Sequence, residues 1–349
     1  MILPQSSEAV LFLAILSLLC LGSWASAYKF AGKWRFELFY LDFAIGLMLA
    51  SVILAFTLGN MGYDGFSFLD DLLNAGKRQW VWVFLAGIIF NLGNMLLMAA
   101  VSVAGLAVAF PMGLGVALVV GTAVGAVSRP AGNMLLLSLG CLLVLTSVAI
   151  NAFSYRIMAI AKHEAQARAG KAKSTRRPSP VKGIVLPVLA GLLLAGFVPL
   201  VERAREGDIG LGPYALGFVF AFGAFVSSFV FDIFFTNLPV EGEPVEFGLY
   251  LQSGRKQHLL GLVAGLMFYT GTLLAWICTN VPAAIRGEPT LRFVMAQGAP
   301  VLAALWGILA FREFKGGDMR LKLLGTLMLV LFVCGLAMIG LAPQLLPNG

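Results

Sequence analysis

Two amide side chains lie three residues apart in one of the most apolar stretches of the chain. Asn91 and Asn94 fall within the run 80–102, and this spacing puts both side chains on one face of a helix. Each amide carries two N–H donors and one carbonyl acceptor, so the pair can match the polar groups of a small polar solute. The alternative is that both amides only join neighbouring helices by hydrogen bonds.

A third amide, Gln297, lies in the run 291–311, about one helical turn before Pro300. A proline lacks the backbone N–H, so it can leave a carbonyl free towards a cavity. Pro300, like Pro111 in the run 106–127, is otherwise expected to kink its helix. We take Gln297 as a candidate contact to the same solute.

Rings and hydroxyls in the later apolar runs are candidates for the wall of such a site. A flat polar ligand is held by ring surface and a few placed hydroxyls. The alternative for the rings is packing between helices or anchoring at the membrane interface. The candidates are Tyr269, Thr272, Trp276 and Trp306.

Two carboxylates, Asp42 and Asp232, lie furthest inside apolar runs. Burial favours the protonated form of a carboxylate, so either residue could carry a proton across the membrane. The alternative is that each side chain extends to the interface or pairs with a cation from a loop. Glu313 lies between Arg312 and Lys315, and this spacing predicts a structural ion pair.

Motifs for cofactor or metal chemistry are missing from the sequence. It contains no GxxxxGK[ST], no HExxH and no CxxC, so neither ATP-driven pumping nor a metal centre is indicated, and no cofactor is expected. The four cysteines fall in apolar runs without paired spacing and are expected to be small hydrophobic residues. Neither His163 nor His258 is expected deep in a helix.

The composition identifies the elements that must position these residues. Of 349 residues, 60% are hydrophobic and 12% are charged, with a mean hydropathy of +0.92. A soluble core cannot absorb this much apolar surface. Crossing ~30 Å of hydrocarbon takes about 20 apolar residues, so the fold class predicted is an all-α integral membrane protein. Ten apolar runs are long enough to cross: 9–28, 38–58, 80–102, 106–127, 134–153, 184–201, 214–236, 258–280, 291–311 and 322–342.

A hydrophilic segment at 155–182 divides the ten runs into five and five. The domains expected are a first repeat at 1–154, a basic cytoplasmic linker at 155–182 and a second repeat at 183–349. Of the 24 Lys and Arg, 17 fall in the loops after the predicted helices 1, 5, 7 and 9, and the other 7 fall in the remaining loops. Positive residues favour the cytoplasmic side, so both termini are predicted outside a plasma (inner) membrane.

An internal pattern supports a repeat. The pattern AGxxFxxGxxL begins at Ala86 and recurs from Ala264. Because the equivalent positions are offset by five helices, an odd number, the two halves are predicted to be inverted relative to each other across the membrane. Inverted repeats are typical of secondary transporters, whose solutes bind near the midplane where the halves meet.

Several strings resemble carriers of the drug/metabolite transporter superfamily, and in particular the ureide permease and the glucose, ribose and rhamnose porter group. The most specific is LWGILAFREFK at 305–315; the others are YLD at 40–42, NLGN at 91–94, VAGL at 103–106, VVGT at 119–122 and QGAP at 297–300. The chain departs from this family at Thr272, where members often have Asn.

The resemblance implies ten helices, an inverted repeat and secondary active transport of small polar solutes. In the family these solutes are ureides and nucleobases, with protons as the expected coupling ion. Alternatives are a sugar porter, a drug or metabolite exporter, an integral-membrane enzyme acting on lipid-linked substrates, and an assembly subunit. The partners expected are a small polar solute and the lipid bilayer, without nucleic acid.

The site is predicted between the helices at 80–102 and 291–311, which belong to opposite halves. Asn94 and Gln297 would be the polar contacts, Asn91 would be a further candidate contact, and Trp306 would form a wall. Two amides avoid the larger desolvation cost of a charge in this position.

Overall fold

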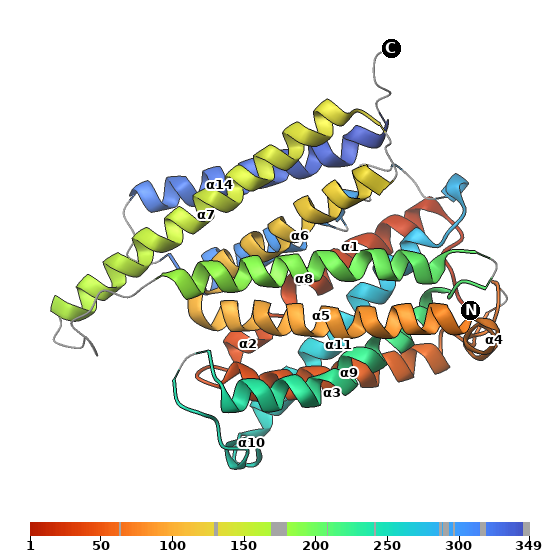
Figure 1. Cartoon of the computed structure of the whole chain (residues 1–349), viewed down its shortest axis with the longest axis horizontal. Coiled ribbons are helices and arrows are strands. Elements are labelled where there is room, and N and C mark those ends of the chain that lie inside the picture. The colour runs from red at the N-terminus through yellow and green to blue at the C-terminus, as the bar shows by residue number, and fades with distance from the viewer. Residues whose placement is uncertain are drawn as a thin grey trace. The chain divides into compact units, whose positions relative to one another are not determined.

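The computed structural model describes residues 1–62, 64–128, 132–168, 180–207, 209–240, 242–285, 288, 293–295, 297–314 and 319–344. Within these ranges all regular structure is helical (Figure 1). A helix satisfies its own backbone hydrogen bonds, and this is why so apolar a chain can enter lipid. The all-helical prediction is therefore confirmed.

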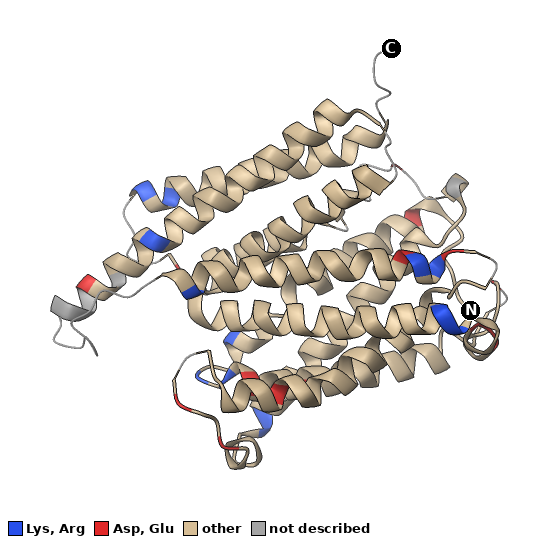
Figure 2. Ribbon diagram, viewed as in Figure 1, with Lys and Arg blue, Asp and Glu red and all other residues tan. Residues whose placement is uncertain are grey.

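Eight of the described helices are long and apolar enough to cross a membrane. They are α3 (Phe36–Phe56), α5 (Lys77–Ala104), α6 (Leu106–Ser128), α7 (Met134–Arg168), α8 (Val181–Arg205), α9 (Pro213–Asn237), α11 (Arg255–Thr279) and α14 (Met319–Leu341). All eight lie at predicted spans. Helix α7 continues to Arg168, so the first half of the expected linker is helical. Figure 2 shows that charged residues gather towards the helix ends.

The first and ninth predicted spans form shorter helices. In the first, α1 (Ser7–Ser23) ends before Trp24, and α2 (Ser26–Phe30) follows it. The Ser26 hydroxyl donates to the Ser23 carbonyl at 2.6 Å, which satisfies this acceptor at the break. The other short helices are α4 (Phe68–Asn74), α10 (Gly248–Leu251), η1 (Ala283–Ile285) and η3 (Ala342–Gln344).

The ninth predicted span consists of α13 (Ala299–Leu305) and a π-helical turn, η2 (Trp306–Ala310). Pro300 is the second residue of α13, where no N–H is needed, and the chain is not helical at Gly298, two residues earlier. Residues 289–292 and 296 of this span lie outside the described ranges.

Pro111 does interrupt the hydrogen bonds inside α6. A proline removes the N–H that would bond to the carbonyl four residues earlier, here that of Ala107. Asn151 of α7 donates its side-chain N–H groups to the Ala107 carbonyl at 3.3 Å and to the Val108 carbonyl at 3.1 Å. A neighbouring helix therefore supplies the donor that the proline lacks.

The chain forms two compact units. The first contains Met1–Met95 and Leu193–Ala299; the second contains Leu96–Leu192 and Pro300–Gly349. In the second unit, α7 and α14 lie side by side (Figure 1). Gly140 and Gly335 allow this approach, because an added Cβ on either would lie within 3 Å of the backbone of the facing helix.

In the first unit, α3 packs against both α9 and α11. Gly265 of α11 lies directly on the Phe43 carbonyl of α3, and a Cβ there would also meet the Leu47 nitrogen at 2.5 Å. Gly87 of α5 lies in the same way on the Phe220 carbonyl of α9. Small residues at these crossings let the helix backbones touch, which is typical of packing in lipid.

Six aromatic rings fill the centre of the first unit. Phe90 of α5 and Phe268 of α11 are stacked with ring centroids 4.9 Å apart. Each of these two rings contacts a pair of rings that also contact each other. The pair at Phe268 is Trp24 and Phe43; the pair at Phe90 is Phe197 and Phe220.

Candidate functional site

Asn91, near the middle of α5, is the centre of a buried network of hydrogen bonds. Its amide N–H donates to the Ser227 hydroxyl of α9 at 2.9 Å. Its Oδ1 accepts from the Tyr40 hydroxyl of α3 at 3.0 Å and from Ser228 at 3.3 Å. All four side chains are buried. One amide therefore joins three helices.

Asn94 enters the same network through Tyr40. Its amide nitrogen donates to the Tyr40 hydroxyl at 3.1 Å, and only 2% of Asn94 is exposed. The prediction that both amides lie on one helix face is confirmed by their shared partner. Each of these hydrogen bonds joins helices, which is the alternative that the sequence left open. A solute that takes one of these hydrogen bonds must replace the present partner.

Tyr269 of α11 lies at the position equivalent to Asn91 in the repeated pattern. Its ring is 1% exposed, and its hydroxyl is buried without a hydrogen-bond partner in the part of the chain that is described. This hydroxyl lies against Gly217 of α9, where a Cβ would be 2.6 Å away. A buried hydroxyl without a partner is unusual and marks a place where a polar ligand would gain a hydrogen bond.

Thr272 and Trp276, on the same helix, both interact with other residues of the protein. The Thr272 hydroxyl donates to the Phe268 carbonyl at 2.9 Å, inside its own helix. The ring of Trp276 packs edge-on against Phe220 at 5.2 Å. Trp276 therefore has the packing role that the sequence gave as its alternative.

Gln297 and Trp306 belong to different units. Gln297 is exposed in the first unit, whereas Asn91 and Asn94 are buried there. Trp306 begins the π-helical turn of the second unit and packs against Phe311 at 6.3 Å. The described contacts bring Asn91 and Asn94 together and do not include either of these two residues.

Asp42 of α3 is buried and doubly hydrogen-bonded. The Tyr250 hydroxyl of α10 donates to its Oδ1 at 2.6 Å, and His258 Nδ1 of α11 lies 2.7 Å from its Oδ2. Gly261 makes room for the carboxylate, because a Cβ on this residue would lie 2.5 Å from that of Asp42. The partner of Asp42 is thus a histidine at the start of a helix, where the sequence suggested a loop cation.

His258 and Tyr250 were not singled out from the sequence. His258 Nε2 lies 3.1 Å from the Tyr250 backbone carbonyl, and the ring packs edge-on against Trp34. Burial raises the pKa of the Tyr250 hydroxyl, and its hydrogen bond to Asp42 and the charges of Asp42 and Asp232 raise it further. This tyrosine therefore remains a neutral donor.

Asp232 of α9 differs from Asp42 in its partners. Only 8% of the residue is exposed, and neither carboxylate oxygen has a hydrogen-bond partner within the described ranges. A charged carboxylate in such a place is costly, so it either takes up a proton or meets a cation.

Glu313 caps a helix of the second unit. Its carboxylate accepts the backbone N–H groups of Leu106 at 3.0 Å and Ala107 at 2.8 Å, at the beginning of α6. These donors have no partner inside their own helix, and a negative charge is favourable at a helix N-terminus. The side chain therefore has a second structural role besides the predicted ion pair with neighbouring cations.

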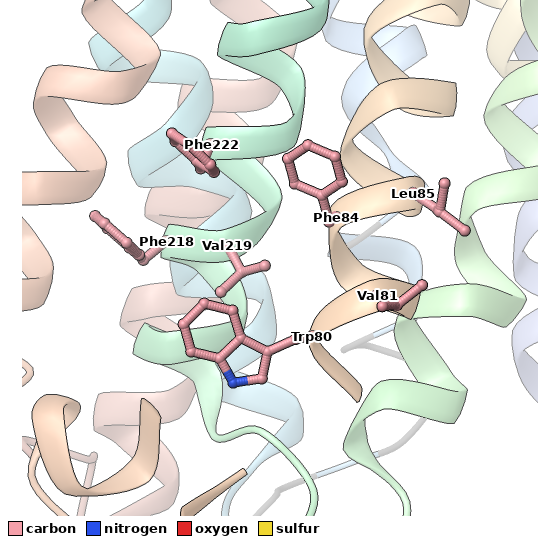
Figure 3. Close-up of a pocket in the computed structure, with 7 residues that line it drawn as sticks. All are labelled: Trp80, Val81, Phe84, Leu85, Phe218, Val219 and Phe222. Atoms are coloured by element: carbon pink, nitrogen blue, oxygen red, sulfur yellow. The ribbon is translucent and has the colours of Figure 1, made fainter. Parts of the chain in front are cut away.

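A groove with a cavity volume of about 260 Å³ lies between α5 and α9 (Figure 3). The residues that line it are Trp80, Val81, Phe84, Leu85, Phe218, Val219 and Phe222. This lining suits a lipid chain and offers nothing to orient a polar solute. No group of three or more metal-ligating side chains occurs in the ranges that the structure describes.

Comparison with known proteins agrees with the resemblance seen in the sequence. The family model described as "Ureide permease" matches residues 39–177. Ureide permease 1 of Arabidopsis thaliana is 23% identical, with 97% of this chain and 98% of the relative covered. Ureide permease 5 of the same plant is 24% identical, with 96% and 94% covered.

A solved chain described as "Crystal structure of protein" has a TM-score of 0.50 and 19% identity, covering 97% of this chain and 98% of its own. This likeness concerns the fold alone. The similarity to permeases extends over nearly the whole chain, and the predicted resemblance to the ureide permease group is confirmed.

Proposed function

We propose that this chain, which is similar to ureide permeases along nearly its whole length, is a secondary transporter of ureides. The relatives are named permeases, and eight helices of this chain can cross a membrane. The observation that carries the proposal is the buried amide network of Asn91 and Asn94 in the middle of α5. A ureide presents alternating N–H and C=O groups, which amides and hydroxyls can pair with neutrally.

The fold proposed for this transporter has ten helices in a 5+5 inverted repeat. The aromatic cluster supports it, because Phe90 and Phe268 occupy equivalent positions of the AGxxFxxGxxL pattern. If α1, α3 and α5 correspond to α8, α9 and α11, then Trp24 corresponds to Phe197 and Phe43 to Phe220. Every ring contact of one set then has its counterpart in the other.

The glycine crossings support the same correspondence. Gly265 lies on the Phe43 carbonyl of α3, and Gly87 lies on the equivalent Phe220 carbonyl of α9. Gly46 of α3 and Gly223 of α9 are likewise equivalent, and each lies on the backbone of the partner helix. The proposed repeats occupy 1–154 and 183–349, joined by a basic cytoplasmic segment at 155–182, with both termini outside the plasma (inner) membrane.

In the proposed site, the ureide takes the hydrogen bonds that now join the helices. Asn94 is the principal contact because it has a single observed partner, the Tyr40 hydroxyl, which a solute carbonyl can replace as the acceptor of the Asn94 N–H. Asn91 and the unpaired Tyr269 hydroxyl occupy equivalent positions in the two proposed repeats and would meet the solute from either side. Thr272 and Gln297 of the same unit complete the proposed lining, and the role of Trp306 as a wall stays a prediction.

Protons are the proposed coupling ion, with Asp42 and Asp232 as their carriers. Both carboxylates are buried towards an end of a transmembrane helix. Neither carboxylate oxygen of Asp232 has a hydrogen-bond partner in the described part of the chain, so a bound proton would spare this group the cost of a buried charge. Uptake of a proton would make movement of the carboxylate through the low-dielectric interior less costly.

The proposal is tested by solute-dependent stabilisation of the purified protein. A ligand that binds only the native state raises its stability, by ~2.7 kcal/mol at a hundred times Kd. We expect allantoin or another ureide to raise the unfolding midpoint, and nucleobases to do so more weakly. Stabilisation by hexoses alone would favour the sugar-porter alternative, and no stabilisation by any of these solutes would contradict the proposal.

The site is tested by the affinity of purified, folded Asn94→Ala and Gln297→Ala for the same solute. Loss of one neutral hydrogen bond costs ~0.5 to 1.5 kcal/mol, or about 2- to 13-fold in Kd. Unchanged affinity in both variants, with less folded protein, would show that these amides only stabilise the fold.

A further inference from the structure

Asp232 of α9 is the only residue in the described part of the chain with two buried side-chain atoms that lack a hydrogen-bond partner. Native proteins leave few buried polar atoms unpaired, and each of them requires an explanation. Packing does not explain a carboxyl group here, because an apolar side chain of the same size would fill the space without the cost of desolvation. The two oxygens therefore point to a ligand that supplies their hydrogen bonds.

The position of Asp232 is one helical turn from the buried amide network. Ser228, four residues earlier on the same face of α9, donates to Asn91 Oδ1 at 3.3 Å. On the facing helix α3, Tyr40 belongs to the network, and the charge of Glu37, one turn before it, acts on Asp232. One turn is ~5.4 Å along the helix axis, so a small cyclic solute can bond to the network at one end and to Asp232 at the other.

The nearby charged and hydroxyl groups are already bonded within the protein. Arg35 pairs with Glu37 at 2.7 Å and also donates to a backbone carbonyl. Asp42 is bonded to His258 at 2.7 Å and to the Tyr250 hydroxyl at 2.6 Å. None of the contacts among the described residues brings a cation to the unpaired carboxyl of α9, so a proton is the simplest means of neutralising it.

The protonated carboxyl has the hydrogen-bonding pattern of an amide. A charged carboxylate offers only acceptors, whereas the acid offers one O–H donor beside one C=O acceptor. Cyclic ureides and nucleobases contain ring amides, in which an N–H and a C=O point to the same side. The acid can pair with this amide edge through two hydrogen bonds, and no net charge is then buried.

We propose that Asp232 binds the solute directly, and that its protonated carboxyl pairs with an amide edge of the solute, so that proton and solute bind together. This inference rests on the proposed function and names the part of the solute that is recognised. Water on the open side supplies the proton and receives it again after the solute leaves, and no bond of the solute is broken. Solutes without an N–H beside the C=O should be excluded.

The affinities of purified Asp232→Asn and Asp232→Ala for uracil and allantoin test this pairing. Asparagine presents an N–H donor and a C=O acceptor as the acid does, so Asp232→Asn should bind as well as the wild type or better. Asp232→Ala loses both hydrogen bonds, and its Kd should rise about 5- to 150-fold. Both variants should fold, because the carboxyl has no hydrogen bond to lose.

The matched control is Thr236→Val, one turn further along α9. The Thr236 hydroxyl donates only to carbonyls of its own helix, at 2.7 Å and 3.0 Å, so this variant should keep the wild-type Kd.

A methylated probe tests which edge of the solute is recognised. 1,3-Dimethyluracil keeps both carbonyls of uracil and lacks both N–H groups, so the wild type should bind it much more weakly than uracil. In Asp232→Ala this difference between the two probes should shrink, because the group that pairs with the N–H is absent.

The outcomes separate this inference from the proposed function. Unchanged affinity of both Asp232 variants would overturn the inference, and so would equal weakening of both, which indicates that a charged carboxylate accepts two N–H groups. Failure of both variants to fold would also overturn it, because the carboxyl would then have a structural role. Absence of uracil and allantoin binding by the wild type would contradict the proposed function itself.

Discussion

Replacing Gly265 by alanine tests the closest helix crossing of the first unit. This glycine of α11 lies directly on the Phe43 carbonyl of α3, and an added Cβ would lie 2.5 Å from the Leu47 nitrogen. Both neighbours are backbone atoms, so no side chain can turn away to make room. The two helices must move apart, and the ring of Phe268 must follow.

The expected cost follows from this geometry. Overpacking a well-filled core typically costs ~1 to 3 kcal/mol. Alanine regains up to ~1 kcal/mol because it favours the helix more than glycine does. We therefore expect a net loss of about 1 to 2 kcal/mol, or roughly 5- to 30-fold in the unfolding equilibrium. Gly87→Ala should cost a similar amount, because its crossing with Phe220 has the same form.

The assay is reversible unfolding of the purified protein in mixed micelles, with Gly196→Ala as the matched control. Gly196 of α8 has no heavy atom closer to an added Cβ than one at 3.9 Å, so this variant should be as stable as the wild type or slightly more stable. Equal stability of all three variants would refute the close crossings on which the proposed repeat depends.

Three further predictions concern charged side chains, each measured by thermal unfolding. Burial raises the pKa of Asp71 in α4 from 3.8 to about 6, so the folded state binds the carboxyl proton more tightly than the unfolded state does. The free energy of unfolding should therefore fall by about 1 kcal/mol as the pH rises from about 4 to about 6, and Asp71→Asn should flatten this dependence. Glu313→Ala should cost about 1 to 2 kcal/mol, because two N–H groups of α6 lose their acceptor; an unchanged midpoint would contradict the capping role. Asp232→Asn should leave the stability at neutral pH unchanged or higher, because its carboxylate has no hydrogen bond to lose. Asp42→Ala should lower the stability by about 2 to 4 kcal/mol, because its carboxylate is bonded to Tyr250 and His258, and equal destabilisation by both variants would contradict this difference.

Hydropathy predicted the long helices because lipid requires an unbroken apolar run of known length. It did not predict the break after Ser23, which depends on a hydroxyl that bonds back to the chain and on rings that pack around Trp24. The capping role of Glu313 was also missed. Its neighbouring cations in sequence predicted an ion pair, and nothing near it in sequence points to the N-terminus of α6, about 200 residues earlier, which needed an acceptor.

The polar side chains likewise have partners that the local sequence does not reveal. Helical spacing placed Asn91 and Asn94 on one face, and they do share Tyr40. Nothing in the local sequence connects Asp42 with His258, because 216 residues separate them and only the packing of α3 on α11 brings them together. A histidine one turn into a helix, with glycine three residues later, is the signal that could have suggested a buried partner.

Uptake of radiolabelled allantoin by proteoliposomes tests the proposed transport of ureides most directly. We predict saturable uptake that unlabelled ureides inhibit, that glucose does not inhibit, and that Asn94→Ala reduces in folded protein. No uptake above protein-free liposomes, or uptake that glucose but not unlabelled ureides inhibits, would contradict the proposed function.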